Sequence, residues 1–241
     1  MKLRLFMILS AFALVALLNS QTSAQEAVKR TATRVVVTGD ALVQAQPDTA
    51  ILTISVVTQN TNALTAQQQN AAESEKVVRA LKSVAGAGAE IKTSGYLLTP
   101  QRVYRENQPP TINGYEARNT VTVTMGELSK VGAVIDAAAE AGANNIDNIT
   151  FTLRKDRPAR NQALTEATRE AISKAQVMAE ALGGRVVRIV EVQEGGTTPR
   201  PMYQREVGEA MVAKSANTPI EVGTLDIHSQ VQLVAEIEMA Q

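Results

Sequence analysis

The chain has no cysteine among its 241 residues, and this absence excludes several classes of protein. Without thiols there is no disulfide framework, no thiolate metal site and no cysteine that could carry a lipid at the amino terminus. Small exported domains often depend on disulfides for their stability. This protein must instead be stabilised by an ordinary hydrophobic core, for which the 217 residues beyond position 24 (241 − 24) are ample.

Histidine is nearly absent, because His228 is the only one. A triad hydrolase needs a histidine beside its nucleophile, and no Gly-x-Ser-x-Gly turn accompanies His228. A structural zinc ion needs four nitrogen or sulfur donors, which the sequence does not offer. The alternation of the last predicted strand places His228 on a polar face, so we interpret it as a solvated strand residue.

Phosphate-binding loops are missing too. Gly183-Gly184 follows a predicted helix and precedes a predicted strand, the reverse of the order that cradles a phosphate. Glu236 and Glu238 share one face of a strand, which would suit calcium or acid–base chemistry but equally a solvated face. We therefore predict no catalytic residue, no cofactor, no metal and no enzymatic activity. A hydrolase built on His228 or on a carboxylate pair is the alternative from that class.

The chain has no excess of either charge, since 24 basic residues face 24 acidic ones. Loss of Lys2 and Arg4 with a leader would leave 22 against 24, a net charge of −2. This balance predicts neither nucleic-acid binding nor attraction to an anionic membrane surface.

The first 24 residues have the three-part layout of a secretory signal peptide. A basic start is followed by an apolar run from Leu5 to Leu18 and by small residues that end at Ala24. The run is shorter than the roughly 20 residues that a membrane-spanning helix needs, and no later stretch approaches that length. We predict cleavage near Ala24, export to the periplasm and no transmembrane segment in the mature chain.

From Arg34 the hydrophobic pattern alternates between the two-residue period of strands and the longer period of helices. Pro47-Asp48 between the first two strands predicts a turn, and hence a hairpin. Residues 194–217 hold glycines, prolines and charges with no period, which predicts a mobile loop. The pattern predicts strands over 34–44, 50–59, 91–103, 112–125, 148–153, 185–193 and 225–239, and helices over 63–85, 124–142 and 156–182. The second helix is expected to open with a capping box at Thr124-Met125-Gly126-Glu127.

These elements predict an α+β fold. The order strand, long helix, strand, strand occurs over 50–125 and again over 148–239, so the chain contains pseudo-duplicated β-α-β-β units with one extra strand in front. We expect mostly antiparallel sheet with helices packed on one face. The predicted organisation is a signal peptide (1–24), a flexible N-terminal segment (25–33) and one domain (34–241).

Two predicted loops combine basic and aromatic side chains. One lies beside Pro109-Pro110, and the other lies within residues 199–205. Each is interpreted as a contact site, with an ordinary exposed loop as the alternative. The candidate contact residues are Arg102, Tyr104, Arg105, Arg200, Tyr203 and Arg205.

Several short segments, in register along the chain, resemble the SIMPL-domain family of periplasmic immunogenic and oxidative-stress-related proteins. Gly39-Asp40 stands where the family commonly has a Gly-Glu pair, which keeps the charge. The matching segments are 37–40 (Val-Thr-Gly-Asp), 46–50 (Gln-Pro-Asp-Thr-Ala), 91–96 (Ile-Lys-Thr-Ser-Gly-Tyr), 99–101 (Thr-Pro-Gln), 113–115 (Asn-Gly-Tyr), 119–123 (Asn-Thr-Val-Thr-Val), 141–143 (Ala-Gly-Ala), 174–175 (Lys-Ala), 181–183 (Ala-Leu-Gly), 218–221 (Thr-Pro-Ile-Glu) and 223 (Gly).

The resemblance implies an envelope protein without established catalytic residues, some of whose relatives form large homo-oligomers. We therefore expect a periplasmic, non-enzymatic protein that acts by self-assembly or binding, in envelope or oxidative stress, with peripheral or outer-membrane association as an option. The first and last strands are expected to be edges open to another subunit. The alternative is a monomeric module that binds a small ligand or a protein through its loops.

Overall fold

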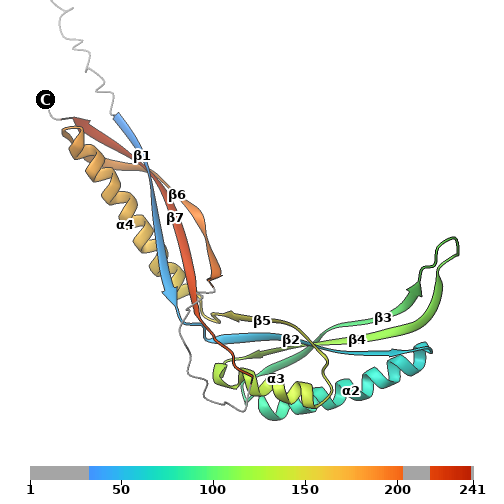
Figure 1. Ribbon diagram of the computed structural model, residues 1–241. Helices are drawn as coiled ribbons and strands as arrows, with labels where there is room; N and C mark the ends of the chain where they lie inside the picture. Colours follow the sequence, from blue (N-terminus) through green and yellow to red (C-terminus); the bar gives the residue numbers. More distant parts are fainter. Residues whose placement is uncertain (1–32, 203–217, 240–241) are drawn as a thin grey trace, which may run out of the picture.

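The structure is a computed structural model that describes residues 33–202 and 218–239. These residues form a curved, elongated molecule of two sheets and their helices (Figure 1). The predicted signal peptide and residues 25–32 lie outside the described residues, whereas Thr33, expected to be flexible, begins the first strand. The strands are β1 (Thr33–Ala45), β2 (Thr49–Asn60), β3 (Glu90–Val103), β4 (Thr111–Met125), β5 (Asn145–Thr152), β6 (Gly184–Met202) and β7 (Thr224–Met239), and the helices are α2 (Ala63–Val84), the 3-10 turn η1 (Leu128–Lys130), α3 (Val131–Glu140) and α4 (Arg157–Ala181).

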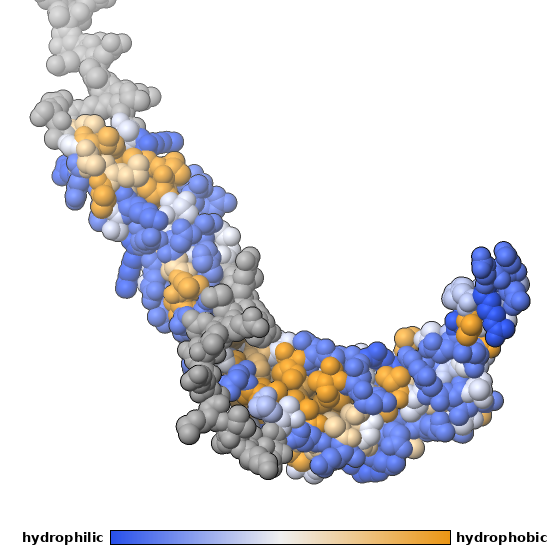
Figure 2. Space-filling view, viewed as in Figure 1, coloured by the Kyte–Doolittle hydropathy of each residue, from blue (hydrophilic) through white to orange (hydrophobic). Residues whose placement is uncertain are grey.

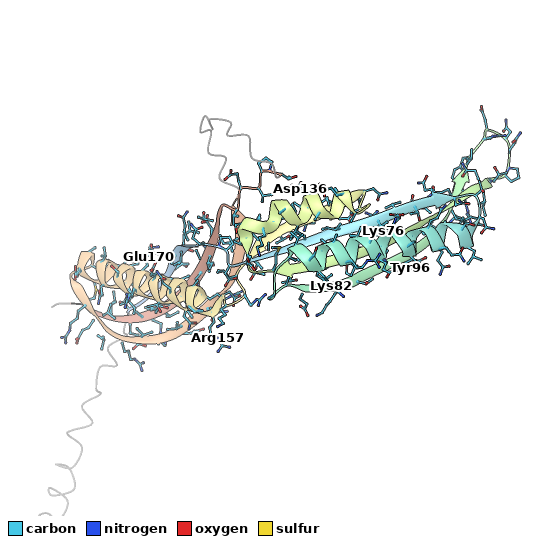
Figure 3. The ribbon with its side chains drawn as sticks, turned by 90° about the horizontal axis from the view of Figure 1, so that it is seen from below. Lys76, Lys82, Tyr96, Asp136, Arg157 and Glu170 are labelled. Carbon is cyan, nitrogen blue, oxygen red and sulfur yellow. The ribbon has the colours of Figure 1, made fainter. Side chains whose placement is uncertain are left out.

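Sheet A has the strand order β1-β7-β6 and sheet B the order β3-β4-β2-β5, with antiparallel pairing throughout. Helix α4 packs on one face of sheet A, and α2 and α3 pack on one face of sheet B (Figures 1 and 3). The other faces of the two sheets line the inner side of the curve (Figure 1). The predicted α+β class, with mostly antiparallel sheet and helices on one face, is confirmed.

The repeated order of elements is also visible in the pairing of the strands. Sheet B contains the set β3-β4-β2, and sheet A contains the corresponding set β6-β7-β1. Strand β5 precedes α4 in the chain, but it pairs with β2 in sheet B. The corresponding position in sheet A, beside β7, is occupied by β1. The extra strand at the front of the chain therefore completes the second unit.

The predicted hairpin of the first two strands is wrong. β1 pairs with β7, whereas β2 pairs with β4 and β5. The reason is that the two strands bury their apolar residues in different cores: Val35 and Val37 lie under α4, and Leu52 and Ile54 lie under α2 and α3. The turn at Pro47-Asp48 carries the chain from one sheet to the other.

Three further predictions are wrong. The second helix does not open with a capping box at Thr124, because β4 continues to Met125 and η1 begins at Leu128 without a side-chain cap. Residues 194–202 were expected to begin the mobile loop, but they extend β6 to Met202 and pair with β7 down to Thr224. A register shift between Glu194 and Thr197 admits the glycines there, so the strand continues where the hydrophobic pattern stops. The rest of that loop, 203–217, lies outside the described residues. The last strand, β7, is the middle strand of sheet A, and only β1 is the edge that was expected.

Helix α4 approaches sheet A closely because its buried face is made of alanine. Gly39 in β1 lies directly beneath it: a methyl group there would be 2.0 Å from the backbone oxygen of Ala167 and 2.5 Å from the backbone nitrogen of Ala171. A glycine at this position lets the helix backbone contact the strand. The buried alanines, spaced four residues apart, are Ala163, Ala167, Ala171, Ala175 and Ala179.

A buried amide fixes α2 on sheet B. The Asn70 side chain is fully buried, and its Nδ2 donates to the backbone oxygens of Val56 in β2 (2.8 Å) and Ala117 in β4 (2.9 Å). Ser74, one turn along the helix, donates to Asn70 Oδ1 at 3.4 Å. One side chain thus joins the helix to two neighbouring strands.

Asp48 closes the junction between the two sheets. Its backbone N–H donates to the oxygen of Thr152 (3.1 Å), and its carboxylate accepts the N–H of Arg154 (2.7 Å) and the hydroxyl of Thr49 (2.8 Å). The chain leaves β1 and β5 on either side of these contacts. A second clasp lies on α3, where Asp136 accepts the backbone N–H (3.0 Å) and the hydroxyl of Thr218.

We predict that Asp48→Asn destabilises the protein by about 0.5–1 kcal/mol at pH 7, a value kept small because the side chain is exposed. The N–H of Arg154 is the main cause that lowers the pKa of Asp48 below its ordinary 3.8. This contribution is therefore complete above pH 3.8 and is lost as the pH falls through the lowered pKa. Urea unfolding at several pH values measures it, and a difference that grew towards low pH would contradict this role.

Candidate functional site

The first predicted contact loop forms the tip of the β3–β4 hairpin. Arg102 is the last residue but one of β3, and Tyr104 and Arg105 follow in the turn, where Tyr104 is 74% exposed. The backbone N–H of Gln108 donates to the oxygen of Arg105 at 3.2 Å, and Asn107 adopts a left-handed φ of 58°. The tip lies at one end of the molecule and presents mostly polar side chains (Figures 1 and 2).

Arg200, from the second predicted contact loop, is not beside the first loop. Arg200 lies in β6, opposite Asp226 of β7, in the part of sheet A that is nearest to the junction. The tip of the β3–β4 hairpin is at the far end of sheet B (Figure 1). Tyr203 and Arg205 lie outside the described residues. The structure therefore does not bring Arg200 together with Arg102, Tyr104 and Arg105.

A polar pocket of about 370 Å³ lies at the base of the β3–β4 hairpin, where the end of β2 meets the two longer strands. Glu116 holds these strands together, because its Oε2 accepts from Gln59 Nε2 (2.9 Å) and from Gln101 Nε2 (3.3 Å). The β3–β4 register shifts between Gln101 and Arg102, so Asn113 has no partner residue there. The lining residues are Gln59, Asn60, Thr61, Gln101, Arg102, Val103, Asn113, Gly114 and Tyr115.

This pocket was missed in the sequence, although Arg102 was singled out. Gln59, Gln101 and Glu116 come from three strands, and single polar residues on strands carry no spacing that would connect them. The available signal was the run Asn113-Gly114-Tyr115 at the start of a strand, since glycine inside a strand pattern often marks a bulge. The pocket offers amide, guanidinium and phenol groups, which can hold a polar ligand by hydrogen bonds.

The inner face of sheet B carries a hydrogen-bonded network around Asp147. Its carboxylate binds the guanidinium of Arg118 and the hydroxyl of Ser55, and it accepts from Asn145 Nδ2 at 2.6 Å. Ser55 is fully buried and also lies 2.9 Å from the hydroxyl of Thr120. The Asp147 carboxylate, which would have to act as the base for Ser55, is already paired with Arg118 and Asn145, so the network fits a structural role.

His228 lies on the inner face of sheet A, as the alternation predicted, and is exposed. Its Nε2 is 3.9 Å from Asp40 Oδ1, which accepts a hydrogen bond from Gln230 Nε2 at 2.9 Å. The neighbouring Ser229 is buried on the opposite face of the strand. Among the residues that the structure describes, His228 therefore has no nucleophile in contact with it, as a hydrolase would need.

Further along the same face, Glu236 lies between two arginines. Its carboxylate is 2.7 Å from Arg188 Nε and 3.6 Å from Arg34. The hydrogen bond from Arg188, together with the charge of Arg34, lowers the pKa of Glu236. Glu238 pairs with Arg185 at 3.2 Å. The two glutamates are thus cross-strand partners of arginines, and within residues 33–202 and 218–239 no cluster of three metal-ligating side chains occurs.

Apolar side chains are exposed at the end of sheet A, where α4 ends and β6 begins (Figure 2). Four residues of β6 and one residue beyond α4 form this apolar end. Since α4 packs mainly on β1 and β7, it does not cover the β6 residues. Exposed fractions on β6 lie between 38% and 57%. The members are Leu182, Val187, Ile189, Val190 and Val192.

Across the part of the chain that the structure describes, no helix combines the length and the apolar character needed to cross a bilayer.

Comparison with known proteins places these features in a family. The family model SIMPL, described as a protein of unknown function (DUF541), matches residues 35–235. A 26 kDa periplasmic immunogenic protein of Brucella melitensis is 31% identical over 212 residues, which cover 85% of each chain. The uncharacterized protein YggE of Escherichia coli K12 is 27% identical over 206 residues, 85% of this chain and 83% of the relative.

Proposed function

The chain belongs to the SIMPL family, and from this membership we propose that it is an exported periplasmic protein that acts by homo-oligomeric assembly and not by catalysis. The word periplasmic in the name of the Brucella relative supports the location, as does the predicted signal peptide over 1–24. The proposal includes one folded domain over 34–241. A role in envelope or oxidative stress, and association with the outer membrane, are part of the same proposal and rest on the resemblance alone.

The observation that carries the assembly is the apolar end of sheet A. Leu182, Val187, Ile189, Val190 and Val192 are all more than a third exposed and lie close together in the chain. Exposed apolar groups of this kind in a soluble domain mark surfaces that another protein covers. A second copy is the occupant that we propose, because an assembly of identical copies buries the same surface in every subunit.

The inner faces of the sheets support a non-catalytic role. Three carboxylates there are bonded to neighbouring side chains, namely those of Asp147, Glu116 and Glu236. Within residues 33–202 and 218–239, the exposed His228 is paired with Asp40 and with no nucleophile. Groups that are already paired stabilise the sheet and are not poised for proton transfer to a substrate.

Co-expression of two differently tagged copies tests the assembly. We expect each tag to recover the other copy, and Val187→Asp with Val190→Asp on β6 to abolish that recovery. Val36→Asp, an equally exposed apolar position on β1, is the matched control and should leave recovery intact. Wild-type copies that never co-purify would contradict the proposal.

The polar pocket at the base of the β3–β4 hairpin favours the alternative, a monomer that binds a small ligand or a protein through its loops. Under that alternative the tagged copies would not recover each other. A different component would co-purify with the tagged protein, and replacing Arg102, Tyr104 and Arg105 together with alanine would abolish its recovery. Arg102 lines the pocket, and the other two residues form the tip beyond it.

A further inference from the structure

Strand β1 is an edge strand with an unusually regular pairing. It matches β7 residue by residue from Thr33 to Ala45 with no register shift. The other edge strands in the described residues, β3, β5 and β6, each have at least one shift in their pairing. Bulges twist an edge away from an incoming strand, so β1 lacks a protection that the other three edges have.

Helix α4 supplies a different cover for this edge. The Glu170 carboxylate accepts the backbone N–H of Asp40, and Lys174 Nζ donates to the backbone oxygen of Thr38 at 2.8 Å. Lys174 Nζ is also 3.0 Å from Glu170 Oε1, one helical turn away. Figure 3 labels Glu170 on α4, on the helix that packs over this sheet. The hydrogen bond from Asp40, followed by that from Lys174, lowers the pKa of Glu170, so the carboxylate is ionised at neutral pH.

The two backbone groups are those that a new strand would need. In an antiparallel pair, alternate residues turn both their N–H and C=O groups away from the partner strand. Thr38 and Asp40 are such residues of β1, because the N–H of Asp40 and the C=O of Thr38 bond to side chains of α4 and not to β7. By the same alternation Val36 and Leu42 are their outward-facing neighbours. Glu170 and Lys174 therefore interrupt the free edge at its middle and leave only short stretches on either side.

The surroundings of the pair would otherwise favour an incoming strand. A groove of about 570 Å³ runs between β1 and α4, and its walls include Val36, Val177 and Met178. An edge strand beside a helix, with apolar walls between them, is the geometry in which extended segments add to a sheet. The strand β6 of another copy, with its exposed Val187 and Val190, has the apolar side chains for such a groove.

We propose that Glu170 and Lys174 guard the free edge of β1 and prevent a strand of a second copy from adding to it. The two side chains take the place of a paired strand, because Glu170 accepts the N–H of Asp40 and Lys174 donates to the C=O of Thr38. This inference is independent of the proposed function, because an open edge is a liability in a monomer as well as in an assembly.

The test is the double variant Glu170→Ala, Lys174→Ala in the full chain. Hydrogen exchange of the Asp40 amide is expected to become about tenfold faster. A labelled peptide with the sequence of residues 184–196 is expected to bind the variant about tenfold more tightly than wild type, whereas a scrambled peptide gains nothing. The matched control, Glu75→Ala with Arg79→Ala, removes an exposed ion pair one turn apart on α2 and should behave as wild type in both measurements.

A second variant keeps the test decisive if the double variant loses its fold. Lys174→Met alone keeps the carboxylate on Asp40 and frees the oxygen of Thr38, so peptide binding should rise while the fold is retained. The proposal is overturned if a folded variant binds the peptide no better than wild type. It is equally overturned if the Asp40 amide of the folded double variant exchanges at the wild-type rate.

Discussion

Replacing Gly39 with alanine is expected to lower the free energy of unfolding by about 3 kcal/mol, a large effect for one methyl group. The new Cβ would lie 2.0 Å from the backbone oxygen of Ala167 and 2.9 Å from the Cβ of Ala171. Neither neighbour can yield by a rotamer change, because one is helix backbone and the other is the methyl group of an alanine. The helix must move off sheet A, which opens the packing along all of its buried alanines.

Thermal unfolding measures this effect. For a chain of this length a loss of about 3 kcal/mol corresponds to a fall in Tm of about 6 to 12 °C. Gly88→Ala is the matched control, because no heavy atom lies within 4 Å of the new methyl group and the glycine has no positive φ. A Tm for Gly39→Ala within a degree of the control would show that α4 does not pack on β1 as described.

Asn70→Ala is expected to cost about 2 to 3 kcal/mol. The substitution removes both hydrogen bonds to the oxygens of Val56 and Ala117 and leaves a gap between α2 and sheet B. Because the site is fully buried, the two carbonyl oxygens lose a partner that bulk water does not replace. The loss should appear in urea unfolding as a lower midpoint with an unchanged slope.

Gln68→Ala is the control for this variant, since Gln68 lies on the exposed side of the same helix. Glutamine and alanine both have a high helix propensity. Its effect should stay within about 0.5 kcal/mol. If Asn70→Ala were as mild as Gln68→Ala, the amide would not be what joins α2 to the two strands.

The elements of this fold were readable because their signals are local. The helix predicted over 63–85 is α2 (Ala63–Val84), and the helix predicted over 156–182 is α4 (Arg157–Ala181). The last strand alternates apolar and polar residues from Leu225 to Met239, and it forms β7 with its apolar side under α4. Periodicity reports which face of an element is buried, and each of these elements buries only one face.

The partners of the strands were not readable, because pairing is a non-local property. Pro47-Asp48 has the chemistry of a turn, but turn residues do not say whether the chain reverses within one sheet or crosses to another. The chain crosses to another sheet because Val35 and Leu52 are buried in different hydrophobic cores. The length of β6 was missed for a related reason: its pairing with β7 extends it through bulges and glycines that have no strand pattern.

The site residues divide in the same way. Arg102, Tyr104 and Arg105 were correctly placed together at one end of a hairpin, because they are neighbours in the chain. Arg200, which was interpreted as part of a separate contact loop, lies in β6 near the junction and away from that tip. The contacts of Glu170 and Lys174 with β1 join positions more than 100 residues apart, and no spacing in the sequence could have indicated them.

We propose above all that this protein assembles with copies of itself. Size-exclusion chromatography with light scattering on the mature chain, over a range of concentrations up to tens of micromolar, tests it most directly. We expect a mass of two or more monomers, and a return to the mass of one monomer when Val187 and Val190 are both replaced with aspartate. A wild-type protein that remains monomeric at tens of micromolar would contradict it.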